Sequence, residues 1–136
     1  VVDYINAYLT DDTLLCIAED CGNYGTGEES SYIISGNAWV NKHAHLVNPI
    51  ESECRIMYLH HWLRIADLTP YISGTTRKKL TQGKLLEIKV PTPSLERQRE
   101  FECVAAKNSI ATSKLREVAT NLTSVIKGIT NQVLEA

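Results

Sequence analysis

A short run of basic and hydroxyl-bearing residues is the part of this sequence best suited to binding an anionic ligand. Residues 74–80 read GTTRKKL, with three adjacent bases and no acid. Arg and Lys neutralise the phosphates of nucleic acids, and Thr hydroxyls donate hydrogen bonds to phosphate oxygens. The loop therefore suits contacts to the phosphates of a nucleic acid, although its composition fits a solvated basic turn equally well. The predicted contacts are Thr75, Thr76, Arg77, Lys78 and Lys79.

The three bases of the loop are expected to differ in role. A guanidinium can donate two hydrogen bonds to one guanine, so Arg77 is the candidate for reading a base, whereas Lys78 and Lys79 suit phosphates. Weaker candidates for DNA contact lie nearer the middle of the chain: Asn41, Lys42 and His43. This hypothesis predicts that Lys78→Ala weakens binding to all DNA sequences alike and flattens its dependence on salt.

The remaining polar clusters do not have the spacing of a catalytic or metal site. The four His and four Cys residues form no C-x-x-C or HExxH pattern of a zinc site. The uneven scatter of the cysteines fits reduced thiols better than a set of disulfides. The glycines of residues 22–27 could suggest a phosphate-binding loop. They favour a tight turn instead, because no Lys follows them and Glu28 and Glu29 would repel an anion. The segment from Asn48 to Glu51 faintly resembles the Asn-Pro-Pro-aromatic motif of adenine methyltransferases, but it lacks the aromatic residue that stacks on a flipped base. We expect no catalysis, no metal and no cofactor of the chain's own.

Several short elements are predicted to position the basic residues. Apolar runs at 13–18, 32–34, 38–40 and 44–47 favour β-strands, with a turn at 35–37. Trp39 is favoured as a core anchor over an exposed stacking residue. Residues 71–73 predict another short strand, and residues 85–90 return to the core.

A helix is predicted to follow the fourth of these strands. Asn48 is a suitable N-cap and Pro49 fits the first turn, while Glu51 lies near the positive end of the helix dipole. The helix should end before Thr69 and Pro70. Its apolar face consists of Ile56, Leu59, Trp62, Leu63 and Ala66.

The last third of the chain predicts one long helix, from Ser94 to Leu134. Apolar residues recur there at alternating steps of three and four, as in a coiled-coil seam. About forty residues make a rod of roughly 60 Å, twice the roughly 30 Å of a globule built from the rest. We therefore expect a helix-pairing face, although an amphipathic helix lying on its own core remains an alternative. The seam consists of Phe101, Val104, Asn108, Ala111, Leu115, Val118, Leu122, Val125, Ile129 and Gln132, flanked by Ala105, Ala119, Ile126 and Val133.

Together these patterns predict an α+β protein. Residues 1–93 would form a small mixed α/β domain, and residues 94–136 one long coiled-coil-type helix. No run of about 18 apolar residues suggests a membrane span, and no leader suggests export, so we expect a cytoplasmic protein. The net charge of −2 hides an asymmetry, since residues 1–40 hold seven acids and no Lys or Arg, whereas the remainder holds 14 bases and nine acids. Such a chain can offer a basic face to DNA.

Two ordered segments resemble a known family. Residues 36–45, GNAWVNKHAH, resemble the "wvnnHah" segment of the target-recognition domain in type I restriction-modification specificity subunits. Residues 72–98 are similar to that family's signature, in which a Gly-Ser/Thr loop precedes an "L…L..I.I..P" pattern and a "PPLxEQ" start of a conserved helix. With the heptad helix included, the resemblance covers nearly the whole chain. Its second part rests on Ser73, Gly74, Thr75, Thr76, Lys79, Leu80, Leu86, Ile88, Pro91, Pro93, Leu95 and Gln98.

The resemblance implies a DNA-reading subunit without chemistry of its own. In the family, each of two recognition domains reads one half of a bipartite site in double-stranded DNA. Two long helices pair antiparallel and set the distance between the half-sites. Modification subunits bind S-adenosylmethionine and methylate adenine, restriction needs a motor nuclease subunit, and ATP and Mg²⁺ belong to these partners.

The chain departs from the family pattern in several places. The family domain normally has a further stretch before Val1, and the chain opens without Met, so we expect that it was cut from something longer. Thr92 and Ser94 flank Pro93 where a second Pro is common, and Lys42 replaces a common Asn. With one recognition domain and one helix, a bipartite reader needs a homodimer or a second domain in the full-length chain. Two alternatives are a coiled-coil scaffold that does not read DNA and the specificity module of a type II-like methyltransferase system.

Overall fold

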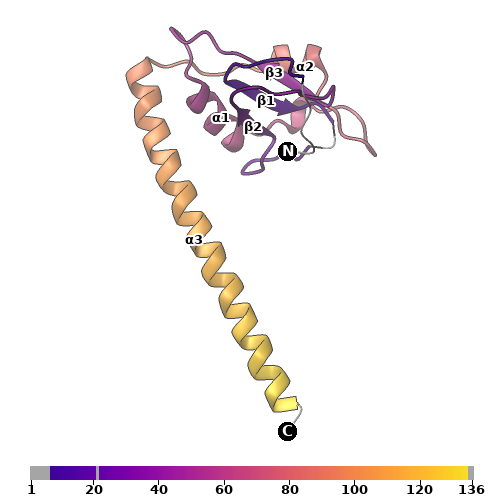
Figure 1. Cartoon of the computed structure of the whole chain (residues 1–136), viewed down its shortest axis with the longest axis vertical. Coiled ribbons are helices and arrows are strands. Elements are labelled where there is room, and N and C mark those ends of the chain that lie inside the picture. Colours follow the sequence, from indigo (N-terminus) through magenta and orange to yellow (C-terminus); the bar gives the residue numbers. More distant parts are fainter. Residues whose placement is uncertain (1–6, 21, 135–136) are drawn as a thin grey trace. The chain divides into compact units, whose positions relative to one another are not determined.

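The computed structural model describes residues 7–20 and 22–134, with side chains of the last helix described up to residue 131. It divides into two compact units, Val1–Arg99 and Glu100–Ala136. The first holds a small sheet with helices, and the described residues of the second, up to 134, are helical (Figure 1). The predicted α+β class is confirmed. The first residues of the chain, Val1 to Ile5, and Cys21 lie outside the described residues.

A three-stranded antiparallel sheet forms the centre of the globular unit. Its strands are β1 (Leu14–Ala18), β2 (Ser31–Ile34) and β3 (Ala44–Val47), arranged in the order β2-β1-β3. Cys16 lies opposite Tyr32 on one side and Leu46 on the other. The central strand is buried from Leu14 to Ile17, because a continuous apolar run suits a strand covered on both faces. All three strands were predicted to within one residue.

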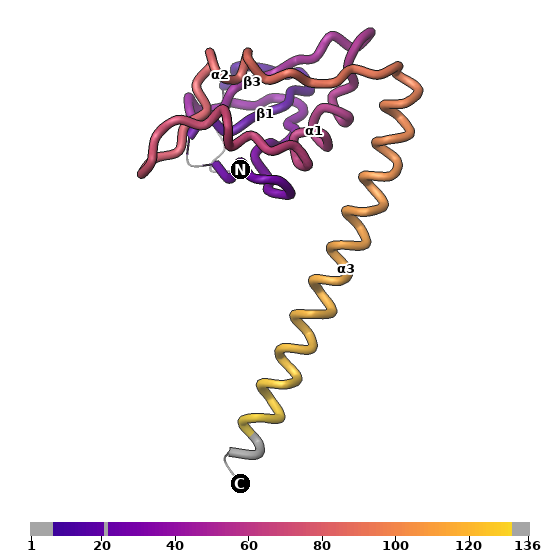
Figure 2. Tube along the Cα trace, turned by 180° about the vertical axis from the view of Figure 1, so that it is seen from behind, coloured from indigo at the N-terminus to yellow at the C-terminus, as the bar shows by residue number. Residues whose placement is uncertain are grey.

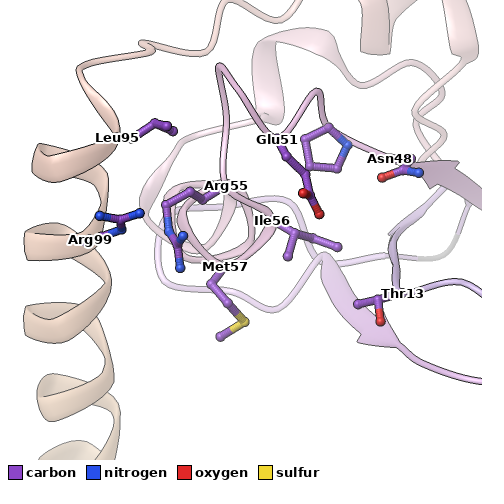
Figure 3. Close-up of a pocket in the computed structure, with 9 residues that line it drawn as sticks. Thr13, Asn48, Glu51, Arg55, Ile56, Met57, Leu95 and Arg99 are labelled. Carbon is purple, nitrogen blue, oxygen red and sulfur yellow. The ribbon is translucent and has the colours of Figure 1, made fainter.

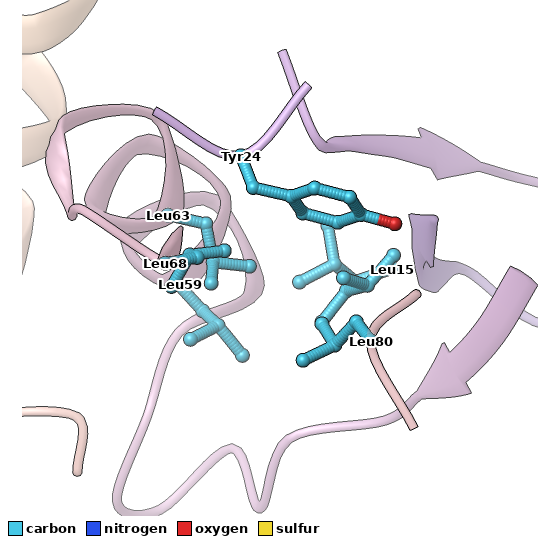
Figure 4. Close-up of a cluster of buried hydrophobic side chains, with 7 residues drawn as sticks. Leu15, Tyr24, Leu59, Leu63, Leu68 and Leu80 are labelled. Atoms are coloured by element: carbon cyan, nitrogen blue, oxygen red, sulfur yellow. The ribbon is translucent and has the colours of Figure 1, made fainter. Parts of the chain in front are cut away.

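Helix α1 (Ile56–Ile65) packs against β1 and β2 and closes the core. Figure 4 shows the leucines of α1 facing Leu15 of the sheet, with the ring of Tyr24 laid beside them. The Tyr24 hydroxyl donates a hydrogen bond to the Ala18 carbonyl, 3.1 Å away. The buried cluster consists of Leu15, Ile17, Tyr24, Leu59, Leu63, Leu68 and Leu80.

The predicted start of α1 at Asn48 is wrong, since the helix begins at Ile56 after a separate turn. In that turn the Ile50 carbonyl accepts hydrogen bonds from the N–H groups of Glu53 and Cys54. The buried Gln98 side chain then takes two backbone groups that a continuous helix would need. Its Oε1 accepts from the N–H of Arg55 at 2.8 Å, and its Nε2 donates to the Glu53 carbonyl at 2.7 Å. A residue 43 positions away thus interrupts the helix.

Three other local predictions are corrected. Residues 38–40 form no strand, because after the turn at Gly36 (φ 75°) only Ala38 makes a bridge, to Thr10. Trp39 is 57% exposed, so it is not a core anchor. Residues 71–73 are not a strand either, since Tyr71 ends the 3-10 helix η1 (Thr69–Tyr71).

The return to the core after the basic loop is partly helical. Helix α2 spans Gln82–Glu87 and is capped by Thr81, whose side chain accepts from the N–H of Lys84. Leu85, Ile88 and Val90 pack against the core as expected, whereas Leu86 is 78% exposed.

The predicted long helix is confirmed as α3 (Leu95–Leu134). Its mixture of charged and apolar residues leaves it too polar for a bilayer, and no helix in the described ranges is both long and apolar enough to span a membrane.

Candidate nucleic-acid interface

One end of the sheet brings together two of the segments that carry charged side chains. Glu19 and Asp20 directly follow β1, and His43 directly precedes β3. The strands are antiparallel, so these ends are neighbours, and the N–H of Glu19 donates to the His43 carbonyl at 2.9 Å. Backbone pairing therefore fixes the acids of one segment beside the predicted DNA-binding residues of another.

The basic loop is attached to the same end of the sheet. Ser73 and Lys79 exchange backbone hydrogen bonds of 2.9 and 2.8 Å, which close the loop between them. The loop begins at Gly74, whose φ of 85° favours glycine, and a Cβ there would lie 2.4 Å from the Arg77 carbonyl oxygen. In Figure 2 this loop is the rose-coloured excursion that extends away from the sheet.

Leu80 anchors the far end of the loop. Its side chain is fully buried, and its N–H donates to the Glu19 carbonyl at 2.7 Å. Its own carbonyl accepts a hydrogen bond from Nε2 of His45 on β3, also 2.7 Å away. The far end of the loop is thus fixed beside the end of β1 and to β3.

Ion pairs and a hydrogen bond join the acids that follow β1 to side chains of the other two segments. Asp20 Oδ2 accepts from Arg77 Nη2 at 2.5 Å and from His43 Nδ1 at 3.1 Å. Glu19 Oε1 lies 2.8 Å from Lys79 Nζ. A single carboxylate oxygen therefore connects Arg77 with His43, which lie on different loops.

These pairs shift the titration of both acids. The hydrogen bond from Lys79 is the main cause that holds the pKa of the Glu19 carboxyl below its usual value. Burial works to raise the pKa of Asp20, but the hydrogen bond and charge of Arg77, with those of His43, outweigh it and lower that pKa. Both carboxylates are therefore ionised at neutral pH and attract the bases beside them.

The three segments surround a hollow of about 370 Å³, which we call the charged hollow. Four predicted DNA-binding residues line it, and two acids complete the lining. The lining of the hollow thus carries three permanently charged basic side chains, two carboxylates and one imidazole. Its lining residues are Glu19, Asp20, Lys42, His43, Arg77 and Lys79.

The other predicted DNA-binding residues lie near the charged hollow in sequence but do not line it. Thr75, Thr76 and Lys78 are exposed in the loop. Asn41 acts locally, because its Oδ1 accepts from the N–H of His43 at 3.0 Å and shapes the turn before β3. The structure therefore gathers four of the eight predicted residues at one place. Whether any of them touches DNA stays a prediction.

Sequence reasoning missed the two acids of the charged hollow. Glu19 and Asp20 come directly after the strand predicted at 13–18, and the partner of Asp20 lies 57 residues further along the chain. A usable signal was present in the sequence. Two acids follow a buried strand in the part of the chain that has no Lys or Arg. This pattern suggests that the fold places Lys or Arg side chains from later segments beside these acids.

Comparison with known proteins identifies the family. The family model described as "Type I restriction modification DNA specificity domain" matches residues 1–101, which is most of the chain. The chain belongs to the type I specificity-domain family. A similar protein is the "Putative type I restriction enzyme specificity subunit" of Haemophilus influenzae, which is 34% identical over 104 residues. The match covers 74% of this chain and 26% of that protein, so the chain spans about a quarter of its relative's length.

The family match covers the globular unit of this specificity domain and ends at the beginning of α3. It therefore includes every residue of the charged hollow. The two segments from which the resemblance was inferred, residues 36–45 and 72–98, both fall within it.

Helix α3, most of which follows the matched residues, carries the predicted pairing face. Within the described chain, its large apolar side chains are exposed from Val104 onward, including Leu115 at 70% and Leu122 at 58%. Phe101 is half-buried, whereas Asn108 and Ala111 are exposed. Further exposed members of the face are Val118, Val125, Ile126 and Ile129. The side chains of Gln132 and Val133 lie outside the described part.

A second hollow of about 390 Å³ lies in the globular unit of the specificity domain, beside the turn that precedes α1. Figure 3 shows the side chains of Arg55 and Arg99 among those that line it, with Ile56 and Met57 from α1. None of the predicted DNA-binding residues lines it. Over the described residues, no group of three or more His, Cys, Asp or Glu side chains is arranged to hold a metal ion.

Proposed function

We propose that this chain reads DNA sequence as part of a type I restriction-modification system, binding one half of a bipartite site in double-stranded DNA. The observation that carries the proposal is the charged hollow, inside a domain of the specificity family. Bases from two separate loops meet there at one end of the sheet. The name of the Haemophilus influenzae relative supports the same class of function.

The bases of the hollow differ in what they can recognise. Arg77 is 63% exposed and has the planar fork that suits a guanine edge. Lys42 and Lys79 suit phosphates on either side of such a contact, and the exposed Lys78 suits a third. The hydroxyls of Thr75 and Thr76 assist as donors to phosphate oxygens.

Helix α3 has a separate task in this proposal. Its exposed apolar face pairs with a second long helix, from another copy of this chain or from another part of the full-length protein. The face is wider than a two-stranded seam needs, because Ile126 is exposed beside it. Its second edge is the proposed docking surface for a modification subunit.

Chemistry belongs to the partners. The modification subunits bind S-adenosylmethionine and transfer methyl groups to adenine, and the motor nuclease subunit uses ATP and Mg²⁺. The chain itself supplies recognition and spacing, and it works in the cytoplasm. A type II-like methyltransferase system would use the same module with a different set of partner subunits.

One competing function has an observation in its favour. A coiled-coil scaffold would explain the exposed face of α3 and needs no DNA. It predicts self-association without DNA binding at any salt concentration, whereas the specificity function predicts both.

The test is to co-express the protein with the methyltransferase subunit of its own system, in a host without DNA methylation, and to map modified adenines genome-wide. A symmetric, interrupted motif would show a homodimer of half-subunits. An asymmetric interrupted motif would show a second recognition domain. No methylation, with the methyltransferase shown to be folded and the complex formed, would contradict the proposed function.

A further inference from the structure

The charged hollow contains carboxylates that a plain phosphate-binding site would avoid. Sites that hold phosphates present cations and N–H donors, since a carboxylate repels the phosphodiester. Here Glu19 and Asp20 stand against three cations. Their presence needs an explanation within the proposed DNA contact.

Asp20 lies beneath the bases that it holds. Its side chain is 11% exposed, whereas those of Arg77 and His43 are 63% and 46% exposed. Its backbone is fixed as well, because Asp20 bridges to Lys79 next to the end of β1. The acid is therefore part of the framework, and the two side chains on it project toward solvent.

A carboxylate in this position restricts a guanidinium. The group is planar, and its five N–H donors have fixed directions. A long Arg side chain on an exposed loop otherwise samples many rotamers, and binding must pay for their loss. With Nη2 held 2.5 Å from Asp20 Oδ2, the Arg77 fork has fewer orientations available before any ligand arrives.

We propose that Asp20 is a positioning residue that orients Arg77 toward a base edge and biases this guanidinium against phosphate. The inference deepens the proposed function and rests on it, because it presumes that this surface contacts DNA. The base edge is uncharged and offers acceptors to the oriented fork. The phosphate is an anion, and near Asp20 it meets a cation whose charge is already balanced.

Glu19 repeats the arrangement with a weaker geometric effect. It holds Lys79 Nζ at 2.8 Å, but an ammonium group has no plane to fix. Its main effect is to neutralise charge. The selectivity for bases over phosphates is therefore assigned to the pair of Asp20 and Arg77.

The experiment compares Asp20→Asn with Asp11→Asn in the full protein. Both variants remove one negative charge by an isosteric change, but Asp11 is exposed and lies outside the charged hollow. The probes are a duplex with the mapped target motif and a scrambled duplex of equal composition. Binding is measured by fluorescence anisotropy at several salt concentrations.

Asp20→Asn is expected to weaken binding to the target about tenfold, the scale of one lost base contact. Binding to the scrambled duplex should stay the same or increase, because Arg77 is released toward phosphate. Because Arg77 then neutralises a phosphate, the salt dependence of Asp20→Asn binding to the scrambled duplex should steepen by up to about one unit of log K per log salt. Asp11→Asn should leave the ratio of target to scrambled affinity unchanged.

A double variant separates positioning from a general structural effect. If Asp20 acts through Arg77, Asp20→Asn adds no further loss of target preference in an Arg77→Ala background. A second loss of the same size, or an equal loss on both duplexes, would overturn the proposal. If Asp20→Asn does not fold, Arg77→Lys decides, since it keeps the charge and removes the fork. Retained target preference in Arg77→Lys would then refute it.

The outcomes also separate this inference from the function on which it rests. A wild-type protein that binds both duplexes equally, or neither, contradicts the proposed function. A wild-type protein that prefers the target, with the same preference in Asp20→Asn, leaves the function standing and removes the role of Asp20.

Discussion

The charged hollow and the apolar face of α3 differ in how far the chain completes them. In the hollow, Asp20 pairs with Arg77 and Glu19 pairs with Lys79, so two of its three cations are held by the same chain. On α3, side chains such as Leu115 and Leu122 are left exposed. An exposed apolar face of this length marks an interaction surface. One region is thus organised before binding, and the other requires another molecule to bury it.

The largest expected effect is the loss of association through the apolar face of α3. Leu115→Asp combined with Leu122→Asp removes two seam leucines, each of which contributes about 1.5–3 kcal/mol when buried. Association of the protein through α3 should weaken more than 100-fold. Sedimentation equilibrium measures the change, and Ser113→Asp with Thr120→Asp, off the seam, is the matched control. Equal weakening by both pairs would show that charge, and not the apolar face, controls assembly.

The next effect concerns the globular unit, which supports the hollow. Gln98 is fully buried, and its Nε2 donates to the carbonyls of Glu53 and Pro93 at 2.7 and 2.8 Å. Gln98→Glu would set carboxylate oxygen against those carbonyls and should lower the free energy of unfolding by about 3 kcal/mol. Urea denaturation gives the value, with the exposed Gln82→Glu as control. A nearly unchanged free energy of unfolding in Gln98→Glu would mean that the Gln98 amide does not hold the turn before α1.

A smaller effect tests the basic loop. Lys78 is exposed and outside the charged hollow, so Lys78→Ala should weaken binding to target and scrambled duplexes alike. The salt slope should fall by about 0.9, as for one lost phosphate contact. Lys84→Ala is the control, since Lys84 pairs with Glu87 on α2. An unchanged salt slope would count against the loop as a DNA contact.

The smallest effect is the pH dependence of the ion pairs in the hollow. The folded protein lowers the pKa values of Glu19 and Asp20. Their stabilising contribution is therefore present above the unfolded pKa of about 4 and is lost as pH falls through the folded values. Between pH 6 and pH 3, the Tm of the wild type should fall more than that of Glu19→Gln combined with Asp20→Asn. Parallel curves would show that these pairs do not stabilise the fold.

The elements set by local pattern could be predicted from sequence. The apolar run at 13–18 gave β1 because a central strand is buried on both faces, and the three-four repeat gave α3. Both depend on the periodicity of neighbouring residues. The basic loop at 74–80 was also visible, since glycine, small residues and adjacent bases cannot fill a core.

The misses depend on contacts that span the chain. Helix α1 begins late because Gln98 takes the backbone of Glu53 and Arg55, and no local signal near Asn48 reports that. Trp39 is exposed although its neighbours suggest a strand. Asp20 was missed for the same reason, because its role appears only when the fold brings Arg77 beside it.

The central claim is that the charged hollow is where this specificity domain meets DNA. The most direct measurement is photo-crosslinking of the full protein to its target duplex, substituted with photoreactive thymine analogues, followed by peptide mass spectrometry. The account predicts crosslinks in peptides that contain residues 41–43 and 75–79. Crosslinks confined to residues 48–57, beside the second hollow, would contradict it.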